Sequence, residues 1–461
     1  NQEAIAFYTQ ALEVSDRVMP SLDAEQLLPV YEGRGIVFRL LRRLEDAIED
    51  FHMMRRMASA LGNQRKEGES LFSLATVHYW RGADHEISMA EQYGQEAVRL
   101  AQLTGDQRTA AGSLLSLGLV DQTRGKPQEA YRKFEESLLI SRREGYKDFM
   151  STNLGWLGTC AGYLGKYERA VAHLTEGLAV SRDITDGLGE LVCLAFLSLA
   201  QVHLGHYGAA INTIQECKAK AEALGNPFFF ARMPNHLGWI HRLFGDFSRA
   251  EALDQESAEL GRPVSMPYAE ISALINLGAD YLGLGQVERA RSHLVKVLDR
   301  IETGEYGAHK ILWAPRLRNT LADACLEMGD HKEALRHVDK SLSIAVASLL
   351  QKRMAEGWAL RGRILAHVGK VQAAGADLQR AFALAEELNS PAITYPIASE
   401  LAQWYEVAGQ EREAMELFGK AKAEVERMAA AMEDEGLRSI FLKWAPVQAI
   451  YESNARLAGN A

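Results

Sequence analysis

The chain has 461 residues, of which 47% are apolar and 24% are charged, a composition typical of a folded protein and not of a disordered one. Its 51 Lys and Arg residues are outnumbered by 61 Asp and Glu residues, and the resulting net charge of −10 disfavours nucleic acid and anionic lipid as partners. No stretch approaches the ~20 consecutive apolar residues that span a bilayer, so we expect no membrane partner.

The four cysteines lie far apart in the sequence and form no CxxC pair. This usage disfavours both a disulfide framework and a zinc site, and it fits a reducing compartment. We therefore expect a cytoplasmic protein whose cysteines serve only as packing residues: Cys160, Cys193, Cys217 and Cys325.

An alanine recurs along almost the whole chain at separations of 40 to 44 residues. Such a period is typical of repeat architectures, in which each repeat is one supersecondary unit that stacks on its neighbours. The recurring alanines are Ala4, Ala47, Ala90, Ala130, Ala170, Ala210, Ala250, Ala290, Ala334, Ala374 and Ala414.

Glycines at fixed distances from these alanines predict two helices in each repeat. A glycine five residues before the alanine, from Gly125 to Gly409, is typical of a helix C-cap followed by a short turn. A small residue twelve positions before the alanine, such as Gly118 or Gly158, allows two helices to approach closely. Each repeat is thus predicted to be an antiparallel helical hairpin.

The first helix, which begins near Asn1 to Ala4, has no partner helix before it, and the chain does not begin with Met. We therefore expect residue 1 to be a boundary within a longer protein, with another module covalently preceding it. Four prolines are expected in the first turns of helices, where no N–H is needed: Pro29, Pro234, Pro315 and Pro396.

These repeats resemble the tetratricopeptide repeat, whose pattern is W-x2-L-G-x2-Y followed by A-x3-F. Residues 274–281 keep L-x2-L-G-x2-Y, and residues 31–38 keep Y-x3-G-x2-F before Ala47 and Phe51. The period of 40 instead of 34 and the missing final proline resemble the long-repeat subclass, whose helices are about a turn longer. The resemblance implies an all-α superhelical solenoid. HEAT and armadillo arrays also have periods near 40, so the period alone does not discriminate, but the fixed twelve-residue step from small residue to alanine favours the tetratricopeptide repeat.

The repeat pattern ends near residue 432. We expect a repeat array over residues 1–432, with an incomplete first repeat, and C-terminal capping helices over residues 433–461; a partner-binding tail is the alternative for the latter. This tail is similar to those that close the repeat arrays of large bacterial regulators, in which a nucleotide-binding switch, a cyclase or a kinase module precedes the array.

No catalytic constellation is present: the chain lacks Walker A, HExxH, GxSxG and CxxC motifs. His203 and His206 are three residues apart, but Gly205 is expected to end the helix between them, which favours surface histidines over metal ligands. We therefore expect no enzyme activity, no cofactor and no metal.

The resemblance also implies that the first helix of each hairpin lines a concave groove. Carrying the inward positions of the family onto this chain selects arginine, asparagine and aromatic residues, a combination suited to an extended peptide or a protein tail. The candidate groove residues are Trp156, Tyr163, Phe196, Arg232, Asn235, His236, Trp239, Arg242, Asn276, Arg316 and Asn319.

Packing roles remain open for several of these residues, because Trp156 and Trp239 could lie between neighbouring helices. The run from Phe228 to Phe230 is expected to start a helix and pack into the stack, and the longer spacing before Ala334 predicts a loop over residues 304–313.

The leading functional hypothesis is a non-catalytic protein- or peptide-interaction module, or a sensor, that serves as the regulatory arm of a larger signalling protein. The alternative is a receptor for a small-molecule effector or signal peptide that controls an upstream module. Nucleic-acid binding by a helical solenoid is a third possibility, which the net charge of −10 opposes.

Overall fold

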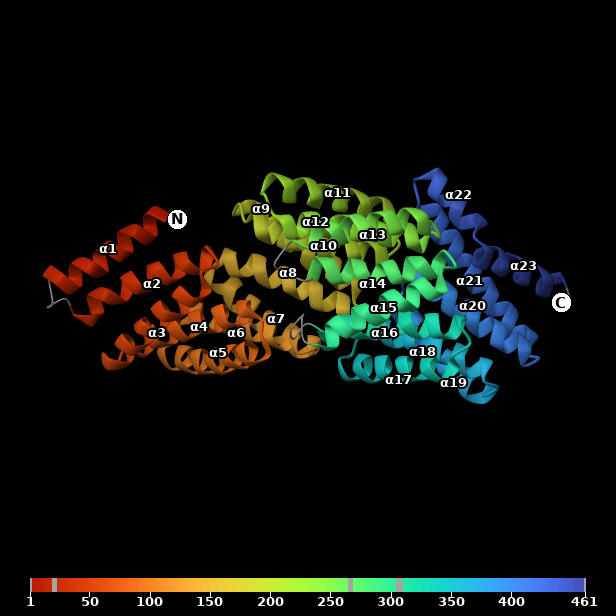
Figure 1. Cartoon of the computed structure of the whole chain (residues 1–461), viewed down its shortest axis with the longest axis horizontal. Coiled ribbons are helices and arrows are strands. Elements are labelled where there is room, and N and C mark those ends of the chain that lie inside the picture. The colour runs from red at the N-terminus through yellow and green to blue at the C-terminus, as the bar shows by residue number, and fades with distance from the viewer. Residues whose placement is uncertain (1, 19–22, 264–267, 304–309, 460–461) are drawn as a thin grey trace. The chain divides into compact units, whose positions relative to one another are not determined.

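The computed structural model describes residues 2–18, 23–263, 268–303 and 310–459, and over these ranges the chain forms 23 α-helices and no strand. The expected all-α solenoid is confirmed. Helices α2 to α21 form ten successive hairpins. Within the stretch α10 to α21, Figure 1 shows neighbouring hairpins side by side. We call the first, even-numbered helix of each hairpin its A helix and the second, odd-numbered helix its B helix.

The chain divides into two compact units, Asn1–Asn153 and Leu154–Ala461. In unit 1 the single helix α1 packs on α2. The helices of unit 1 are α1 (Gln2–Val18), α2 (Ala24–Leu40), α3 (Leu44–Ala60), α4 (Gln64–Arg81), α5 (Asp84–Thr104), α6 (Gln107–Thr123) and α7 (Pro127–Glu144), and α8 (Lys147–Tyr163) contains the boundary.

Unit 2 holds the remaining helices, of which the last two follow the final hairpin. They are α9 (Tyr167–Asp183), α10 (Gly187–His203), α11 (Tyr207–Ala223), α12 (Pro227–Leu243), α13 (Phe247–Gly261), α14 (Tyr268–Gly283), α15 (Val287–Glu302), α16 (Lys310–Glu327), α17 (His331–Ala347), α18 (Gln351–His367), α19 (Val371–Leu388), α20 (Pro391–Val407), α21 (Glu411–Ala431), α22 (Glu435–Lys443) and α23 (Ala445–Gly459).

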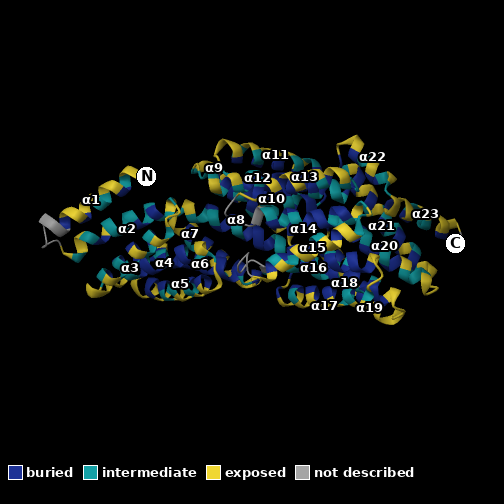
Figure 2. Ribbon diagram, in the orientation of Figure 1, coloured by how far each residue is buried: buried dark blue, intermediate teal, exposed yellow. Residues whose placement is uncertain are grey.

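The predicted repeat frame is confirmed at the residues that defined it. From Ala47 to Ala414, every recurring alanine is at most 1% exposed. The glycines five residues before them, from Gly125 to Gly409, all have φ between 72° and 79°, the left-handed conformation that ends a helix without a Cβ penalty. Figure 2 shows the buried residues concentrated between helices, as expected when stacked hairpins supply the core.

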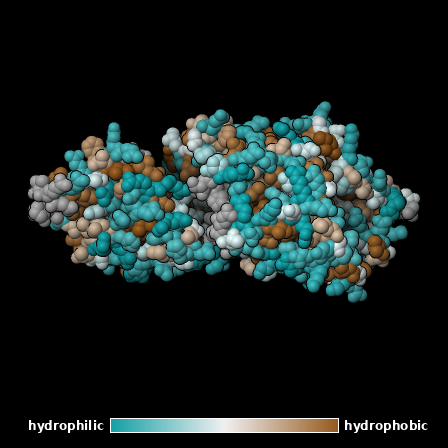
Figure 3. Space-filling model, viewed as in Figure 1, coloured by the Kyte–Doolittle hydropathy of each residue, from teal (hydrophilic) through white to brown (hydrophobic). Residues whose placement is uncertain are grey.

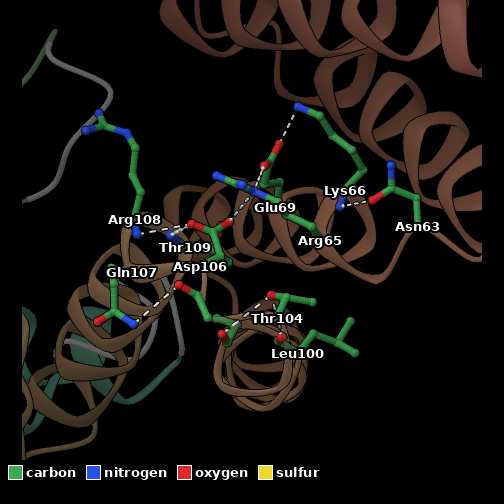
Figure 4. Close-up of polar contacts among 12 residues, drawn as sticks. Asn63, Arg65, Lys66, Glu69, Leu100, Thr104, Asp106, Gln107, Arg108 and Thr109 are labelled. Atoms are coloured by element: carbon green, nitrogen blue, oxygen red, sulfur yellow. Dashed lines mark hydrogen bonds and ion pairs between the residues drawn. The ribbon is translucent and has the colours of Figure 1, made fainter.

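Short polar side chains begin several helices. Asp106 precedes α6, and its carboxylate accepts hydrogen bonds from the backbone N–H of Arg108 and Thr109 and from the Thr109 hydroxyl at 2.7 Å (Figure 4). Arg65 of α4 lies 3.6 Å from the same carboxylate. Such N-caps satisfy backbone donors that have no partner within the helix.

The four prolines expected in first turns lie inside helices instead, so this prediction is wrong. The A helices begin about one turn earlier than the repeat motif suggests; α12, for example, begins at Pro227, seven residues before Pro234. A proline in this region lacks the N–H of one intrahelical hydrogen bond. The loss lies close to the helix N-terminus, where the first four N–H groups have no intrahelical partner in any case. The added turn is the extra length expected of the long-repeat subclass.

Unit 2 curls so that hairpins about five repeats apart meet. The ring of Phe441, on α22, lies 4.9 Å from the ring of Phe244 at the end of α12, and Phe441 is fully buried. The ring of Trp444 lies 5.5 Å from that of Phe247. The helices after the last hairpin therefore pack on α21 and also on the turn between α12 and α13.

The face drawn in Figure 3 carries mostly polar side chains, with apolar ones dispersed among them. In the part of the chain that the structure describes, no helix is long and apolar enough to span a bilayer.

Candidate ligand-binding face

The A helices of unit 2 form a continuous inner layer. Contacts join α10 to α12, α12 to α14, α14 to α16, α16 to α18 and α18 to α20. Side chains also meet across this layer: Lys352 of α18 places its Nζ 4.6 Å from the ring centroid of Trp239 on α12 and 3.5 Å from Nε2 of His203 on α10. Helices separated by three or four hairpins can touch in this way only if the layer curves inward, and we call this surface the inner face.

The predicted groove residues differ in exposure. Those that remain half-buried, and so retain accessible surface, are Trp156, Tyr163, Phe196, Trp239, Arg242 and Arg316. Those that are buried are Arg232, Asn235, His236, Asn276 and Asn319. The structure thus brings the candidates onto the A helices, but about half of them point into the packed layer.

Aromatic and cationic side chains form a strip at the start of the inner face. The rings of Trp156 and Phe196, on α8 and α10, lie 6.4 Å apart. The guanidinium of Arg232, on α12, lies 5.5 Å from the Phe196 ring and 5.3 Å from that of Phe228. Because Trp156 and Phe196 are half-buried, this strip offers apolar surface with an adjacent positive charge.

A buried ionic network occupies the middle of the inner face. Arg242 pairs with Asp254 of α13 and, at 2.6 Å, with Asp280 of α14, and both carboxylates are fully buried. Asn235 donates a hydrogen bond to Asp254 at 2.6 Å. Burial raises the pKa of Asp280 and raises that of Asp254 to about 8, because one guanidinium cannot neutralise two buried carboxylates. We infer that this pair shares a proton near neutral pH.

Cations gather at the far side of the inner face. Arg316, on α16, donates from Nη2 to the Ser272 carbonyl at 2.7 Å, whereas its Nε is buried without a hydrogen-bond partner. On α18, Arg353 pairs with Glu356 at 2.6 Å, and Lys352 lies 3.8 Å from the same carboxylate. Burial lowers the pKa of Arg316 to about 9 and that of Lys352 to about 7.

Neither the acidic partners of Arg242 nor the α18 residues are among the groove residues predicted from the sequence. Asp254 had a recognisable signal: it stands four residues after Ala250, where most repeats carry a large apolar residue such as Phe134 or Leu174. Lys352 had no signal in the sequence, because it lies in the additional first turn of its A helix. It contacts Trp239 only because the helices of unit 2 curve toward each other.

His203 and His206 were both predicted to lie at the surface, and this prediction is wrong for His203. Its ring stacks on Tyr167 at 4.2 Å, with its Nδ1 3.5 Å from the Ser390 hydroxyl, and the side chain is buried because α20 returns to cover the end of α10. His206 is exposed and lies beyond the helix. Burial lowers the pKa of His203, so the ring is neutral.

Other expectations have mixed outcomes. All four cysteines are free and buried, as predicted for packing residues. Phe229 is buried in the first turn of α12, as expected. The loop expected over residues 304–313 is partly wrong, because α16 begins at Lys310 and Trp313 is buried; residues 304–309 lie outside the described residues. Within the described residues, no three His, Cys, Asp or Glu side chains are grouped to hold a metal ion.

The geometry defines an α-helical hairpin array with a polar and aromatic inner face. Residues 109–183 and 269–345 match the family described as Tetratricopeptide repeat, which supports a repeat array of this type. No curated protein sequence matches the chain.

Two solved structures share the fold at low sequence identity. The apo form of RapI is 15% identical with a TM-score of 0.50, covering 60% of this chain and 99% of its own. The apo form of the quorum sensor NprR from B. thuringiensis is 11% identical with a TM-score of 0.51, covering 83% of this chain and 98% of its own. At these identities the likeness establishes the architecture alone.

Proposed function

We propose that this chain is a non-catalytic interaction module whose inner face in unit 2 binds an extended peptide or protein segment. The observation that carries the proposal is the strip of Trp156, Phe196 and Arg232 on three successive A helices. Half-buried aromatic rings beside an arginine are typical of binding hot spots, because they offer large apolar contact area with a directional charge.

The spacing of this strip suits an extended ligand. Trp156 and Phe196 occupy equivalent positions of neighbouring repeats, and their rings lie 6.4 Å apart. Residues on one face of an extended chain are about 7 Å apart, so alternate side chains of a bound segment can contact successive repeats. The four free, buried cysteines support a cytoplasmic setting for such a module.

We also propose that the module is the regulatory arm of a larger signalling protein. The description of NprR, which shares the fold, as a quorum sensor supports a sensor role. The coding sequence upstream of Asn1 tests this part of the proposal, since an NTPase, cyclase, kinase or DNA-binding module should precede the array. A continuous reading frame that adds only further repeats would contradict it.

Peptide selection tests the binding proposal. Ligands would be selected from a random-peptide phage library on the immobilised chain, and their affinities measured for Trp156→Ala and Phe196→Ala variants. We expect each substitution to weaken binding by at least about tenfold, because truncation of a hot-spot anchor costs about 2 kcal/mol or more. Val407→Ala, which removes an apolar side chain that is 82% exposed, is the control. Selected peptides that bind all variants equally would place the site elsewhere.

A further inference from the structure

The inner face of unit 2 carries more positive charge than its own carboxylates neutralise. Arg316 forms no ion pair with any carboxylate of the described residues, and its one hydrogen bond goes to a backbone carbonyl. Lys352 and Arg353 share the single carboxylate of Glu356. Below pH ~7, where Lys352 is protonated, three cations therefore face one anion.

The neighbouring acids do not correct this imbalance. Asp254 and Asp280 lie nearby, but both pair with Arg242, and burial raises the pKa of both carboxyls, so that the pair shares a proton near neutral pH and carries one negative charge that Arg242 neutralises. After burial, the largest influence on the pKa of Arg316 is the positive charge of Arg353, which lowers it further. The fold thus holds like charges together at a cost in stability. Such clusters of perturbed ionisable groups are typical of functional sites, and here a ligand of opposite charge would relieve the repulsion.

Aromatic and amide groups complete the surroundings. The Trp239 ring lies 4.6 Å from Lys352, and the neutral His203 ring lies beside both. Asn319, one helical turn from Arg316, has neither its amide oxygen nor its amide nitrogen hydrogen-bonded. Unpaired buried polar groups are costly, and a bound ligand that pairs with them would recover that cost.

The cluster is deep within the protein but not sealed from solvent. The Lys352 side chain is 18% exposed and that of Arg353 is 22% exposed, and Trp239 is half-buried. An arginine presents a planar pair of donors to two oxygens of a carboxylate or phosphate, and a lysine adds a compact charge. The indole ring supplies a flat apolar wall for the rest of the ligand.

We propose that Arg316 and Lys352 bind the anionic group, carboxylate or phosphate, of a ligand whose body packs against Trp239 inside unit 2. This goes beyond the proposed function, because it assigns a site for a charged ligand at α16 and α18, apart from the aromatic strip on α8 and α10. Removing these two cations should leave the unliganded chain as stable as before or more stable, since repulsion is relieved.

Thermal unfolding of the full chain in acetate, phosphate or chloride at equal ionic strength tests the site. Ligands that bind the native state raise the unfolding temperature by mass action. We expect acetate or phosphate to raise it for the wild type and for Lys340→Gln, an exposed lysine of α17, and to lose that effect in the double variant Arg316→Gln/Lys352→Gln. A shift in phosphate alone identifies a phosphate ligand, and a shift in acetate a carboxylate.

Iodide quenching of tryptophan fluorescence provides a second measurement that does not depend on the double variant. The fluorescence of Trp239 is the difference between the wild type and Trp239→Phe. If the cations attract anions, iodide should quench this fluorescence more strongly than neutral acrylamide does. Added phosphate or acetate should then reduce the quenching by iodide. The proposal is overturned if neither anion raises the wild-type unfolding temperature, if the double variant retains the full shift, or if the Trp239 component shows no preference for iodide.

Discussion

Leu174 occupies the space that a side chain on Gly158 would need: a Cβ placed on this glycine would lie 2.3 Å from the leucine Cγ. The same relationship joins Gly118 to Phe134 and Gly278 to Leu294, in each case sixteen residues apart. The small residue of the A helix and the large residue of the B helix therefore form one contact, repeated along the chain, which fixes how closely each hairpin closes.

Gly158→Ala should destabilise unit 2 by about 1–3 kcal/mol, because the added methyl forces Leu174 or the helix backbone to move. Gly162→Ala, one turn later on α8, is the matched control: nothing lies within 4 Å of its Cβ position, and alanine favours the helix by up to ~1 kcal/mol. Urea unfolding checks both variants. A Gly158→Ala variant as stable as Gly162→Ala would show that the close approach is not required.

Asp254→Asn should change how stability depends on pH. The folded-state pKa of Asp254 is about 8, above the ~4 of an unfolded aspartate, so the folded state binds more protons between these values and loses stability as pH rises through this range. The variant removes this contribution and leaves Arg242 paired one-to-one with Asp280.

Because the lowered pKa values of the buried His203 and His236 act in the opposite sense below pH ~6.5, the informative quantity is the difference between wild type and variant. We expect the unfolding free energy of the wild type, relative to Asp254→Asn, to fall from pH 5 to pH 8. Glu288→Gln, an exposed carboxylate of α15, should show a flat difference. A flat difference for Asp254→Asn as well would mean that the buried pair shares no proton.

Phe441→Ala should detach the C-terminal helices from the turn between α12 and α13. The ring is fully buried against Phe244 and Tyr395, and truncating such a ring costs about 3–5 kcal/mol. Hydrogen exchange should accelerate at Gly245 and Asp246, which precede Phe441 by 196 and 195 residues in the sequence. Ile440→Ala, at a site 42% exposed, should leave their exchange unchanged; equal exchange in both variants would contradict the role of Phe441.

Asp106→Ala should weaken the start of α6 by about 1 kcal/mol, because the backbone N–H groups of Arg108 and Thr109 lose their acceptor. Faster hydrogen exchange of these two amides is the appropriate measurement, since local opening in a two-unit chain need not alter global unfolding. Asp106→Asn retains a side-chain acceptor and should restore protection. Failure of asparagine to do so would point to the ion pair with Arg65 instead.

The hairpins were predictable from the sequence because their determinants are local. Ala170 marks a buried contact, Gly165 marks a helix end and Gly158 marks the close approach of two helices. All three lie within a span of twelve residues in the sequence. The position of Pro234 was not predictable from the motif, because the added turn at the start of the A helix carries no conserved spacing of its own within these repeats.

The candidate site was predictable only in part. The motif placed Arg232, Trp239 and Arg316 on A helices, and the structure finds them there. Neighbouring repeats decide the exposure of each side chain and the acidic residue with which it pairs. Arg242, for example, pairs with Asp280, which lies one repeat further along the chain.

The sequence by itself determined the repeat period, the two helices of each repeat, the glycines that end them and the small-to-large contact that closes them. Tertiary structure alone decided that Lys352 lies beside His203 and Trp239, and that Phe441 covers Phe244. The physical reason is that the curl of a solenoid is the sum of small rotations at successive hairpin contacts, and no single position in the sequence records that sum.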